Sequence, residues 1–259
     1  MAKIGGYKPT PSDVSYDSFS MVRSLVKNAS TGTEYIIPQF TPIYDQGQTN
    51  TCVANATCGA LEIVLGLQDK NSVVQLSRLF LYYNSKVTDK TTDKDDGTFI
   101  HSAFGTLKTL GVCPEDMWPF DSKLIGHQPG ILCYKAGDDN KILNFYRIDS
   151  TGSDRVNDVE ALIQTNSPVV FATEVSKEFE NYSGGTKVFE APAVSVGGHA
   201  MVIVGVRTNA AGKKEFRIRN SWGTSWGDNG FAWVSEDYLM SDSTSDLWIC
   251  TRVNNITTD

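Results

Sequence analysis

Residues 45–55 read Asp45-Gln46-Gly47-Gln48-Thr49-Asn50-Thr51-Cys52-Val53-Ala54-Asn55 and decide how the chain is interpreted. The stretch ends a turn-like run and opens an apolar-periodic segment, which places Cys52 at or near a helix N-terminus. Unpaired backbone N–H groups and the helix dipole favour a thiolate there. Gln46 offers a side-chain amide that can donate to a developing oxyanion. Cys52 is therefore either a nucleophile or a small apolar filler, depending on whether a base and its orienting partner exist elsewhere.

Length and charge limit the classes of protein to be considered. The chain has 259 residues, with 23 basic and 30 acidic side chains and a formal net charge of −7. This length suits one large domain or two closely packed lobes, and the acidic balance disfavours nucleic acid and anionic membranes as partners. The N-terminus lacks the apolar core of a secretory signal, and no apolar run approaches a membrane span. We therefore expect a cytoplasmic protein, while export by another route and a phage origin stay open.

The five cysteines are an odd number, widely scattered, with no Cys-x-x-Cys pair. This pattern fits neither a zinc site nor a dense disulfide framework. We expect reduced thiols, no metal and no cofactor, with one internal disulfide as the alternative.

The first half of the chain predicts helices. Apolar residues recur at a spacing of three to four from Cys52 onward, which is typical of a helix with a buried face. We expect helices over residues 52–67, 77–87 and 100–110, an irregular crossing over 112–140, and an extended segment over 34–44. Gly111 follows the third helix at the position that often ends a helix.

The second half changes character. A short helix is predicted over residues 156–166, and strands over 168–175, 200–206 and 215–220, the last two forming a hairpin. The chain is thus expected to be an α+β protein of two lobes.

Three histidines are candidates for the base. His101 begins a predicted helix and His127 lies in a predicted loop, so both are interpreted as surface or helix-end residues. His199 follows Gly198, which lets backbone or substrate approach closely, and it leads into the buried strand.

Asn220 lies on the apolar face of the second predicted hairpin strand. An amide is unusual on such a face unless it forms a hydrogen bond with another polar group. Pairing of the two strands can bring its carbonyl oxygen to the ring of His199 and fix the tautomer. Trp222 and Trp226 can shield that hydrogen bond from water, although plain core packing is the alternative.

The chain from about residue 34 to 252 resembles the papain-like cysteine peptidases. Four blocks carry the resemblance: Asp45–Ala56; Asp96-Gly97 with the later Gly111–Phe120; Gly198-His199-Ala200; and Arg219-Asn220-Ser221-Trp222-Gly223 through Phe231. The resemblance implies the family's two-lobe fold, with a helical left lobe (about 45–140) holding a central catalytic helix. It implies an antiparallel β-sheet or barrel as the right lobe (about 141–240), with the chain ends crossing between lobes.

The resemblance also implies roles. Cys52 would be the nucleophile, held as a thiolate by His199, which acts as base and then acid, and Asn220 would orient the imidazole. Gln46 would donate to the oxyanion together with the backbone N–H of Cys52. The implied activity is that of a cysteine endopeptidase working through an acyl-enzyme.

The resemblance implies that the enzyme selects an apolar side chain at the substrate residue two before the scissile bond. The residues that would bind substrate are Gly97, Thr98, Phe99, Gly198, Trp222 and Asp246, with Ser245 or Asp246 near the floor of the pocket. If Asp246 points inward, basic or polar side chains become acceptable there; a surface position is the alternative.

Two departures point to a subgroup. Thr49 replaces a cysteine that normally forms a disulfide, and Val53 replaces the usual tryptophan after the nucleophile. Both resemble the bacterial and phage-borne members.

Residues 1–27 form an arm that precedes the peptidase body, residues 28–259. The arm either folds across the cleft and restrains activity or merely packs as a tail. We expect polypeptide substrates and a monomer. A papain-like acyltransferase or deamidase would use the same residues, and an inactive peptide-binding module is a further alternative.

Overall fold

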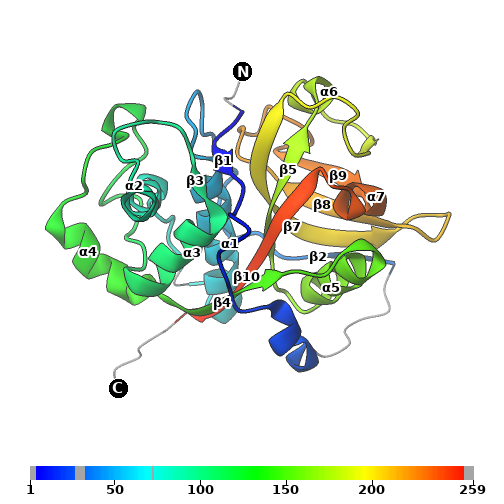
Figure 1. Ribbon diagram of the computed structural model, residues 1–259, viewed down its shortest axis with the longest axis horizontal. Helices are drawn as coiled ribbons and strands as arrows, with labels where there is room; N and C mark the ends of the chain where they lie inside the picture. Colours follow the sequence, from blue (N-terminus) through cyan, green and yellow to red (C-terminus); the bar gives the residue numbers. More distant parts are fainter. Residues whose placement is uncertain (1–3, 27–32, 72, 254–259) are drawn as a thin grey trace.

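The computed structural model describes residues 4–26, 33–71 and 73–253. Figure 1 shows a group of helices and a large sheet on either side of one central helix, α1 (Cys52–Gln68). The α+β, two-lobe architecture expected from the sequence is confirmed.

The sheet is mostly antiparallel and has the strand order β4-β10-β5-β7-β8-β9-β6, with β2 pairing on β7. Its strands are β2 (Glu34–Ile36), β4 (Ile142–Ile148), β5 (Val169–Val175), β6 (Val188–Phe189), β7 (Gly197–Thr208), β8 (Lys214–Arg219), β9 (Phe231–Ser235) and β10 (Thr244–Val253). β7 is a nearly continuous apolar run because α1 and α5 (Gly152–Gln164) both pack against it. The β7–β8 hairpin predicted from the sequence is present, and Asn209 closes its turn by accepting from the amide of Lys213.

The helical lobe is built on α1, α2 (Arg78–Asp89) and α3 (Ile100–Thr109). Ser77 caps α2 by accepting from the amide of Phe80 at 3.1 Å. Gly111 follows α3 with a φ of +68°, the left-handed geometry that ends a helix. The region expected to be an irregular crossing also contains a short helix, α4 (Ile131–Gly137). Two more short helices, α6 (Lys177–Glu180) and α7 (Glu236–Met240), lie in the β lobe.

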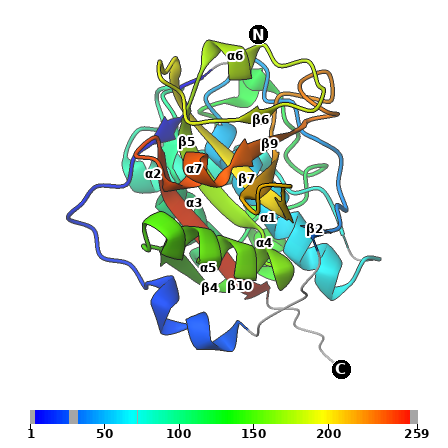
Figure 2. The ribbon, with the colours of Figure 1, turned by 90° about the vertical axis from the view of Figure 1, so that its right-hand side faces the viewer.

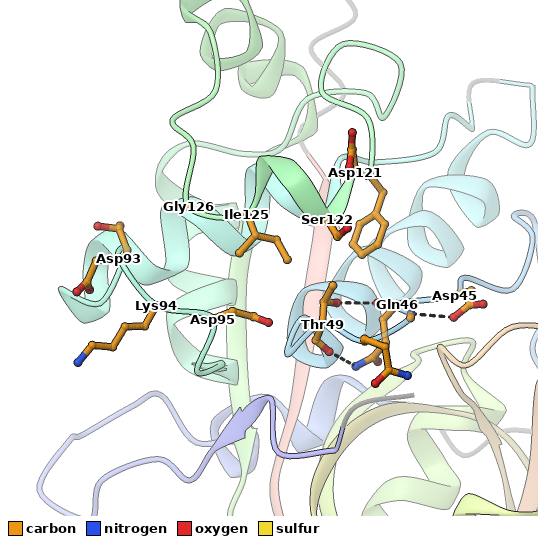
Figure 3. Close-up of a pocket in the computed structure, with 14 residues that line it drawn as sticks. Asp45, Gln46, Thr49, Asp93, Lys94, Asp95, Asp121, Ser122, Ile125 and Gly126 are labelled. Atoms are coloured by element: carbon orange, nitrogen blue, oxygen red, sulfur yellow. Dashed lines mark hydrogen bonds between the residues drawn. The ribbon is translucent and has the colours of Figure 1, made fainter. Parts of the chain in front are cut away.

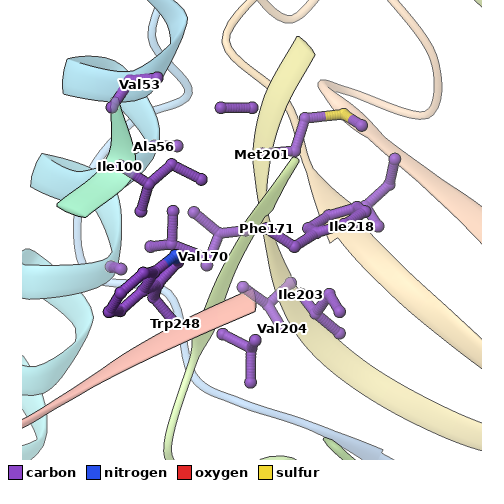
Figure 4. Packing of buried hydrophobic residues seen from close by; sticks show 14 of the residues in the cluster. Val53, Ala56, Ile100, Val170, Phe171, Met201, Ile203, Val204, Ile218 and Trp248 are labelled. Atoms are coloured by element: carbon purple, nitrogen blue, oxygen red, sulfur yellow. The ribbon is translucent and has the colours of Figure 1, made fainter. Parts of the chain in front are cut away.

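The core lies between α1 and the sheet, where side chains from both lobes interdigitate (Figure 4). Val53 and Ala56 of α1 lie on the same side of the sheet as Val170 and the completely buried Trp248 of β10, whereas the side chain of Met201 lies on the other side. Burying each large apolar side chain is worth about 1.5–3 kcal/mol. This packing fixes the start of α1, and with it Cys52, against β7.

The N-terminal arm crosses the molecule between the two lobes (Figures 1 and 2). Its strand β1 (Tyr7–Lys8) pairs in parallel with β3 (Thr98–Phe99) of the helical lobe. Residues 11–15 are exposed, and two short 3-10 turns follow, η1 (Phe19–Met21) and η2 (Arg23–Leu25). The arm is thus held at two separate places.

The second of these places is a platform on the β lobe. Phe19 is buried, and the Arg23 guanidinium pairs with Asp158 of α5 at 2.5 Å. The Ser18 hydroxyl donates to Asp149 at 2.7 Å. These contacts anchor the arm independently of the cleft.

Within the described ranges, no helix is long and apolar enough to cross a membrane. All five cysteines, each of them in the described part of the chain, are free thiols. The same residues contain no group of three or more His, Cys, Asp or Glu side chains placed to hold a metal ion.

Candidate active site

Cys52 is the first residue of α1 and is completely buried. Burial raises the pKa of its thiol to about 12, although the backbone N–H groups of Ala200, Val53 and Cys52 itself act in the opposite direction. The proximity to the Ala200 amide places the sulfur beside the residue that follows His199. Exclusion of water thus favours the neutral thiol while the site is covered, whereas the resemblance implied a thiolate.

His199 is the third residue of β7, so it lies inside the strand rather than before it. Its Nε2 is 2.7 Å from Oδ1 of Asn220, and the ring stacks on Trp222 with centroids 4.5 Å apart. Burial lowers the pKa of the imidazole to about 4, although the hydrogen bond with Asn220 raises it. Among the described residues, Nδ1 has no hydrogen-bond partner.

Asn220 follows the last residue of β8 and lies at the imidazole, as the hairpin predicted. The backbone N–H of Ser221 donates to the same Oδ1 at 2.7 Å, which identifies that atom as the acceptor. The Nε2 of His199 therefore carries a hydrogen, and Nδ1 has the lone pair of a base.

Gln46 is buried in the turn before α1 and connects to the same strand end. The Ser221 hydroxyl donates to Oε1 of Gln46 at 2.7 Å. The Nε2 of Gln46 donates to the Thr49 carbonyl at 2.9 Å (Figure 3). The backbone N–H of Gln46 also donates to the Ser221 backbone carbonyl at 2.9 Å. Ser221 thus ties the candidate oxyanion donor to Asn220. Ser221 could not be recognised as a site residue from the sequence, because a serine between Asn220 and Trp222 carries no spacing signal of its own.

Behind Asn220, the two lobes are joined through buried charges. Arg219 donates to Oε1 of Gln39 at 2.9 Å and to the Pro42 carbonyl at 2.6 Å. Glu62 in α1 accepts from the hydroxyl of Tyr44 and from the amide of Leu76. Burial raises the pKa of Glu62, although these donors act in the opposite direction. The segment that leads to Gln46 is thereby fixed to α1 and to β8 together.

The arm lies across the residues expected to bind substrate. The Gly5 amide donates to the Gly198 carbonyl at 3.1 Å, and the Thr98 amide donates to the Gly6 carbonyl at 3.1 Å. A Cβ on Gly6 would lie 2.3 Å from the Asn50 carbonyl oxygen, so only glycine fits that position. Gly97, with a φ of +84°, packs against the same point of the arm.

Asp246 points inward, so the surface position considered from the sequence is wrong. Its Oδ2 accepts from the hydroxyl of Tyr7 at 2.6 Å and from the amide of Thr10 at 2.7 Å. Its Oδ1 lies 3.3 Å from a guanidinium nitrogen of Arg147. Ser245 lies 2.9 Å from the Tyr7 hydroxyl oxygen. The arm residue Tyr7 therefore occupies the pocket whose floor the sequence assigned to Ser245 and Asp246.

The other predicted residues divide between two sides of the catalytic group. Thr98 and Phe99 pair with Tyr7 and Lys8 of the arm. Trp222 instead stacks on His199 and lines a separate cavity of about 390 Å³, together with Trp226.

A larger cavity of about 1120 Å³ adjoins the turn that carries Gln46 (Figure 3). Its wall includes Asp45, Asp93, Asp95 and Asp121, with Lys94 as the basic lining residue. Asp95 also accepts from the backbone amide of Asn50 at 3.2 Å, which braces the turn before Cys52.

Known proteins resemble this chain in sequence and in fold. The profile of the papain family cysteine proteases matches residues 34–246. The uncharacterized peptidase C1-like protein L477 of Acanthamoeba polyphaga mimivirus is 30% identical over 228 residues, covering 85% of this chain and 72% of that protein. Vignain of Vigna mungo is 30% identical over 196 residues, covering 74% of this chain and 50% of vignain. The chain thus spans about half the length of that plant protein.

Among solved structures, xylellain, a cysteine protease from Xylella fastidiosa, superimposes with a TM-score of 0.80 at 27% identity, covering 98% of both chains. The profile match runs from β2 into β10, and the fold is shared over nearly the whole chain with a cysteine protease from Xylella fastidiosa. This chain therefore belongs to the papain family of cysteine proteases.

Proposed function

We propose that this chain is an endopeptidase that hydrolyses peptide bonds with Cys52 as nucleophile, His199 as base and Asn220 as its orienting partner. The observation that carries the proposal is the buried 2.7 Å contact between His199 and Asn220. Because Nε2 is used in this contact, Nδ1 is the basic nitrogen, and it has no hydrogen-bond partner among the described residues. The next residue of the strand, Ala200, directs its backbone N–H to the Cys52 thiol. A structural histidine would be expected to use both ring nitrogens.

The chemistry follows from these roles. His199 takes the thiol proton, and the sulfur of Cys52 bonds to the substrate carbonyl carbon while the carbonyl electrons move to oxygen. Collapse of this intermediate expels the amine, which receives the proton from the imidazolium, and leaves a thioester. His199 then deprotonates a water that attacks the thioester, releasing the acid and restoring the thiol.

We assign Gln46 and the backbone N–H of Cys52 to the oxyanion. Ser221 supports the assignment, because its hydroxyl holds the oxygen end of the Gln46 amide and so fixes the direction of the N–H₂ end. The amide of Cys52 belongs to the first turn of α1, where backbone N–H groups lack intrahelical partners. Both donors are held in place before substrate arrives, which is the arrangement that favours stabilisation of developing charge.

We further propose that residues 4–10 restrain the enzyme, and that the chain divides into an arm (1–27) and a peptidase body (28–259). With the arm in place, both Cys52 and His199 are 0% exposed. Burial raises the pKa of the thiol and lowers the pKa of the imidazole, which favours the neutral form of both groups. Departure of the arm would admit water and allow the thiolate and imidazolium forms to be populated.

We infer that the chain belongs with the bacterial and viral members of the family. The similarity to xylellain covers nearly the whole of both chains and thus extends over the arm. Thr49 and Val53, the two departures noted in the sequence, occupy buried positions beside the candidate nucleophile.

Labelling with an epoxysuccinyl thiol-protease probe tests the peptidase proposal. Wild-type protein should acquire one adduct at Cys52, located by peptide mass spectrometry, and Cys52→Ala should acquire none. Incubation with unstructured polypeptides should then release fragments whose new ends carry one added water. Products that carry a transferred acyl group, or a deamidated side chain without cleavage, would replace peptidase by one of the alternative activities. No adduct at Cys52, even after the arm is loosened by Gly6→Ala, would overturn the assignment of the nucleophile.

A further inference from the structure

We propose that the pocket now filled by Tyr7 selects a phenol, so that the preferred substrates carry tyrosine two residues before the scissile bond. This specificity rests on the proposed peptidase function and adds the substrate class to it. The arm supplies the argument, because Tyr7 is seated among Thr98, Gly198 and Asp246, three of the residues expected to bind substrate.

The floor of the pocket can pair with a hydroxyl group both as a donor and as an acceptor of hydrogen bonds. The Tyr7 hydroxyl donates to Asp246 at 2.6 Å, so its oxygen is left to accept from Ser245 at 2.9 Å. Burial, with the charge of Asp246 next in importance, raises the pKa of Tyr7 and keeps the phenol protonated. A phenylalanine ring would provide neither function, and the buried carboxylate would lose a donor.

Basic side chains fit the floor less well, although an inward carboxylate alone would suggest them. Lysine and arginine have only donors, so they could donate to the oxygen of Ser245 but could not accept its hydroxyl hydrogen. In addition, Arg147 already lies 3.3 Å from Asp246 and balances its charge. A second cation would meet the guanidinium of Arg147 at close range. The pair of Asp246 and Arg147 thus turns an acidic floor into a polar but nearly neutral one.

The walls of the pocket accept a flat ring. Gly198 has no side chain on the side that faces Tyr7, and a Cβ there would lie 3.1 Å from Cδ1 of the ring. The main chain of Thr98 fixes the depth of entry by pairing with the arm in register with Tyr7. A ring that enters at this depth brings its para substituent to Asp246.

Peptide turnover gives the first test. We would compare kcat/KM of the full-length chain for fluorogenic dipeptides that differ only at the residue two before the cut, with tyrosine, phenylalanine or arginine there. The arm competes with every substrate equally, so the ratios do not depend on how often it is docked. Tyrosine should exceed phenylalanine by about 10- to 100-fold, the range for one hydrogen bond to a charged group. Ser245→Ala should reduce that ratio.

The arm itself gives a second test that needs no peptide turnover. Tyr7→Phe should dock more weakly and should raise the rate at which a small alkylating reagent modifies Cys52 by about tenfold or more. Tyr16→Phe is the matched control, since the buried hydroxyl of Tyr16 has no hydrogen-bond partner among the described residues. It should leave the labelling rate unchanged.

The outcomes separate the two proposals. Equal labelling of Tyr7→Phe and wild type, or turnover in which phenylalanine or arginine matches tyrosine, would overturn phenol selection while leaving the peptidase intact. Faster labelling of Tyr7→Phe without cleavage of any peptide would instead remove the peptidase function, and with it the substrate class.

Discussion

Gly6→Ala should release the arm and raise peptide turnover without altering the catalytic residues. In the docked arm an alanine Cβ at this position would lie 2.3 Å from the Asn50 carbonyl oxygen, 2.5 Å from its carbon and 2.8 Å from Cα. Ordinary contacts begin about 1 Å further out, and all three atoms are backbone, so no side chain can swing aside. Gly6 does not have a positive φ, unlike Gly5, so alanine is acceptable in the free arm.

The size of the effect can be worked from the contacts. Relieving the overlap by shifting packed groups typically costs about 1–3 kcal/mol. The shift also breaks the 3.1 Å hydrogen bond from Thr98 to Gly6, which is worth about 1 kcal/mol. Docking should therefore weaken by about 2–4 kcal/mol, or by roughly 30- to 1,000-fold in the ratio of covered to open enzyme. The observed gain in rate levels off once most molecules are open.

Two readouts check this prediction. Initial rates of a fluorogenic dipeptide and the rate of Cys52 alkylation should both rise in Gly6→Ala. Ser12→Ala, an exposed arm residue, should match wild type in both. If a Gly6→Ala protein with the wild-type melting temperature shows neither increase, the arm does not restrain the enzyme and the steric reasoning is wrong.

Three further predictions concern the site and its support. Gln46→Ala should lower kcat by about 10²–10³ if its amide serves the oxyanion, with equal probe labelling at saturation; an unchanged kcat would contradict that role. Acidification should open the arm of Cys52→Ala, in which no thiolate is present to pair with His199: burial lowers the pKa of the covered imidazole to about 4, against an ordinary value of about 6.5, so its contribution to docking is complete above pH 6.5 and is lost as the pH falls toward 4. Hydrogen exchange of the Thr98 amide, corrected for its intrinsic pH dependence, should therefore accelerate over that range, and constant protection would refute the linkage. Glu62→Ala should lower the melting temperature by about 6 °C or more, because the hydroxyls of Thr41 and Tyr44 and the amide of Leu76 lose their acceptor at about 1 kcal/mol or more each. Glu62→Gln should lower the melting temperature less. A change under about 2 °C in Glu62→Ala would show that these hydrogen bonds do not stabilise the fold.

The sequence allowed prediction wherever local pattern and motif agreed. α1, α2 and α3 have apolar periodicity and recognisable ends, such as the Ser77 cap and Gly111. The meeting of His199 and Asn220 followed from one hairpin, since antiparallel pairing of two adjacent strands leaves little freedom in where their ends lie.

Elements without a clean pattern were missed for physical reasons. β4 has a mostly half-buried surface, so its side chains do not alternate. β10 changes register between Ser245 and Trp248, which breaks the period of two. α4 exposes Ile131 and Leu132, which are 80% and 67% accessible, opposite to the expectation for a packed helix.

The contact that defines the pocket could not be read from the sequence either. Tyr7 and Asp246 are 239 positions apart, and neither belongs to a periodic segment that would bring them together. An isolated aspartate whose orientation the sequence leaves open gives no sign that a tyrosine donates to it. Only the path of the arm between the lobes reveals which of the two orientations of Asp246 is present.

The double anchoring of the arm determines how the proposed inhibition would depend on concentration. Residues 4–10 occupy the cleft, while Phe19 and the Arg23–Asp158 ion pair hold the far side of the exposed segment 11–15 to the β lobe. An arm that leaves the cleft therefore remains within a short tether of it, at an effective concentration that reaches the millimolar range for short flexible linkers. Closure is then a first-order event within one molecule, so specific activity should not change on dilution. Cutting the chain between residues 11 and 15 would convert the same contacts into those of a free peptide, whose hold on the cleft weakens with every dilution.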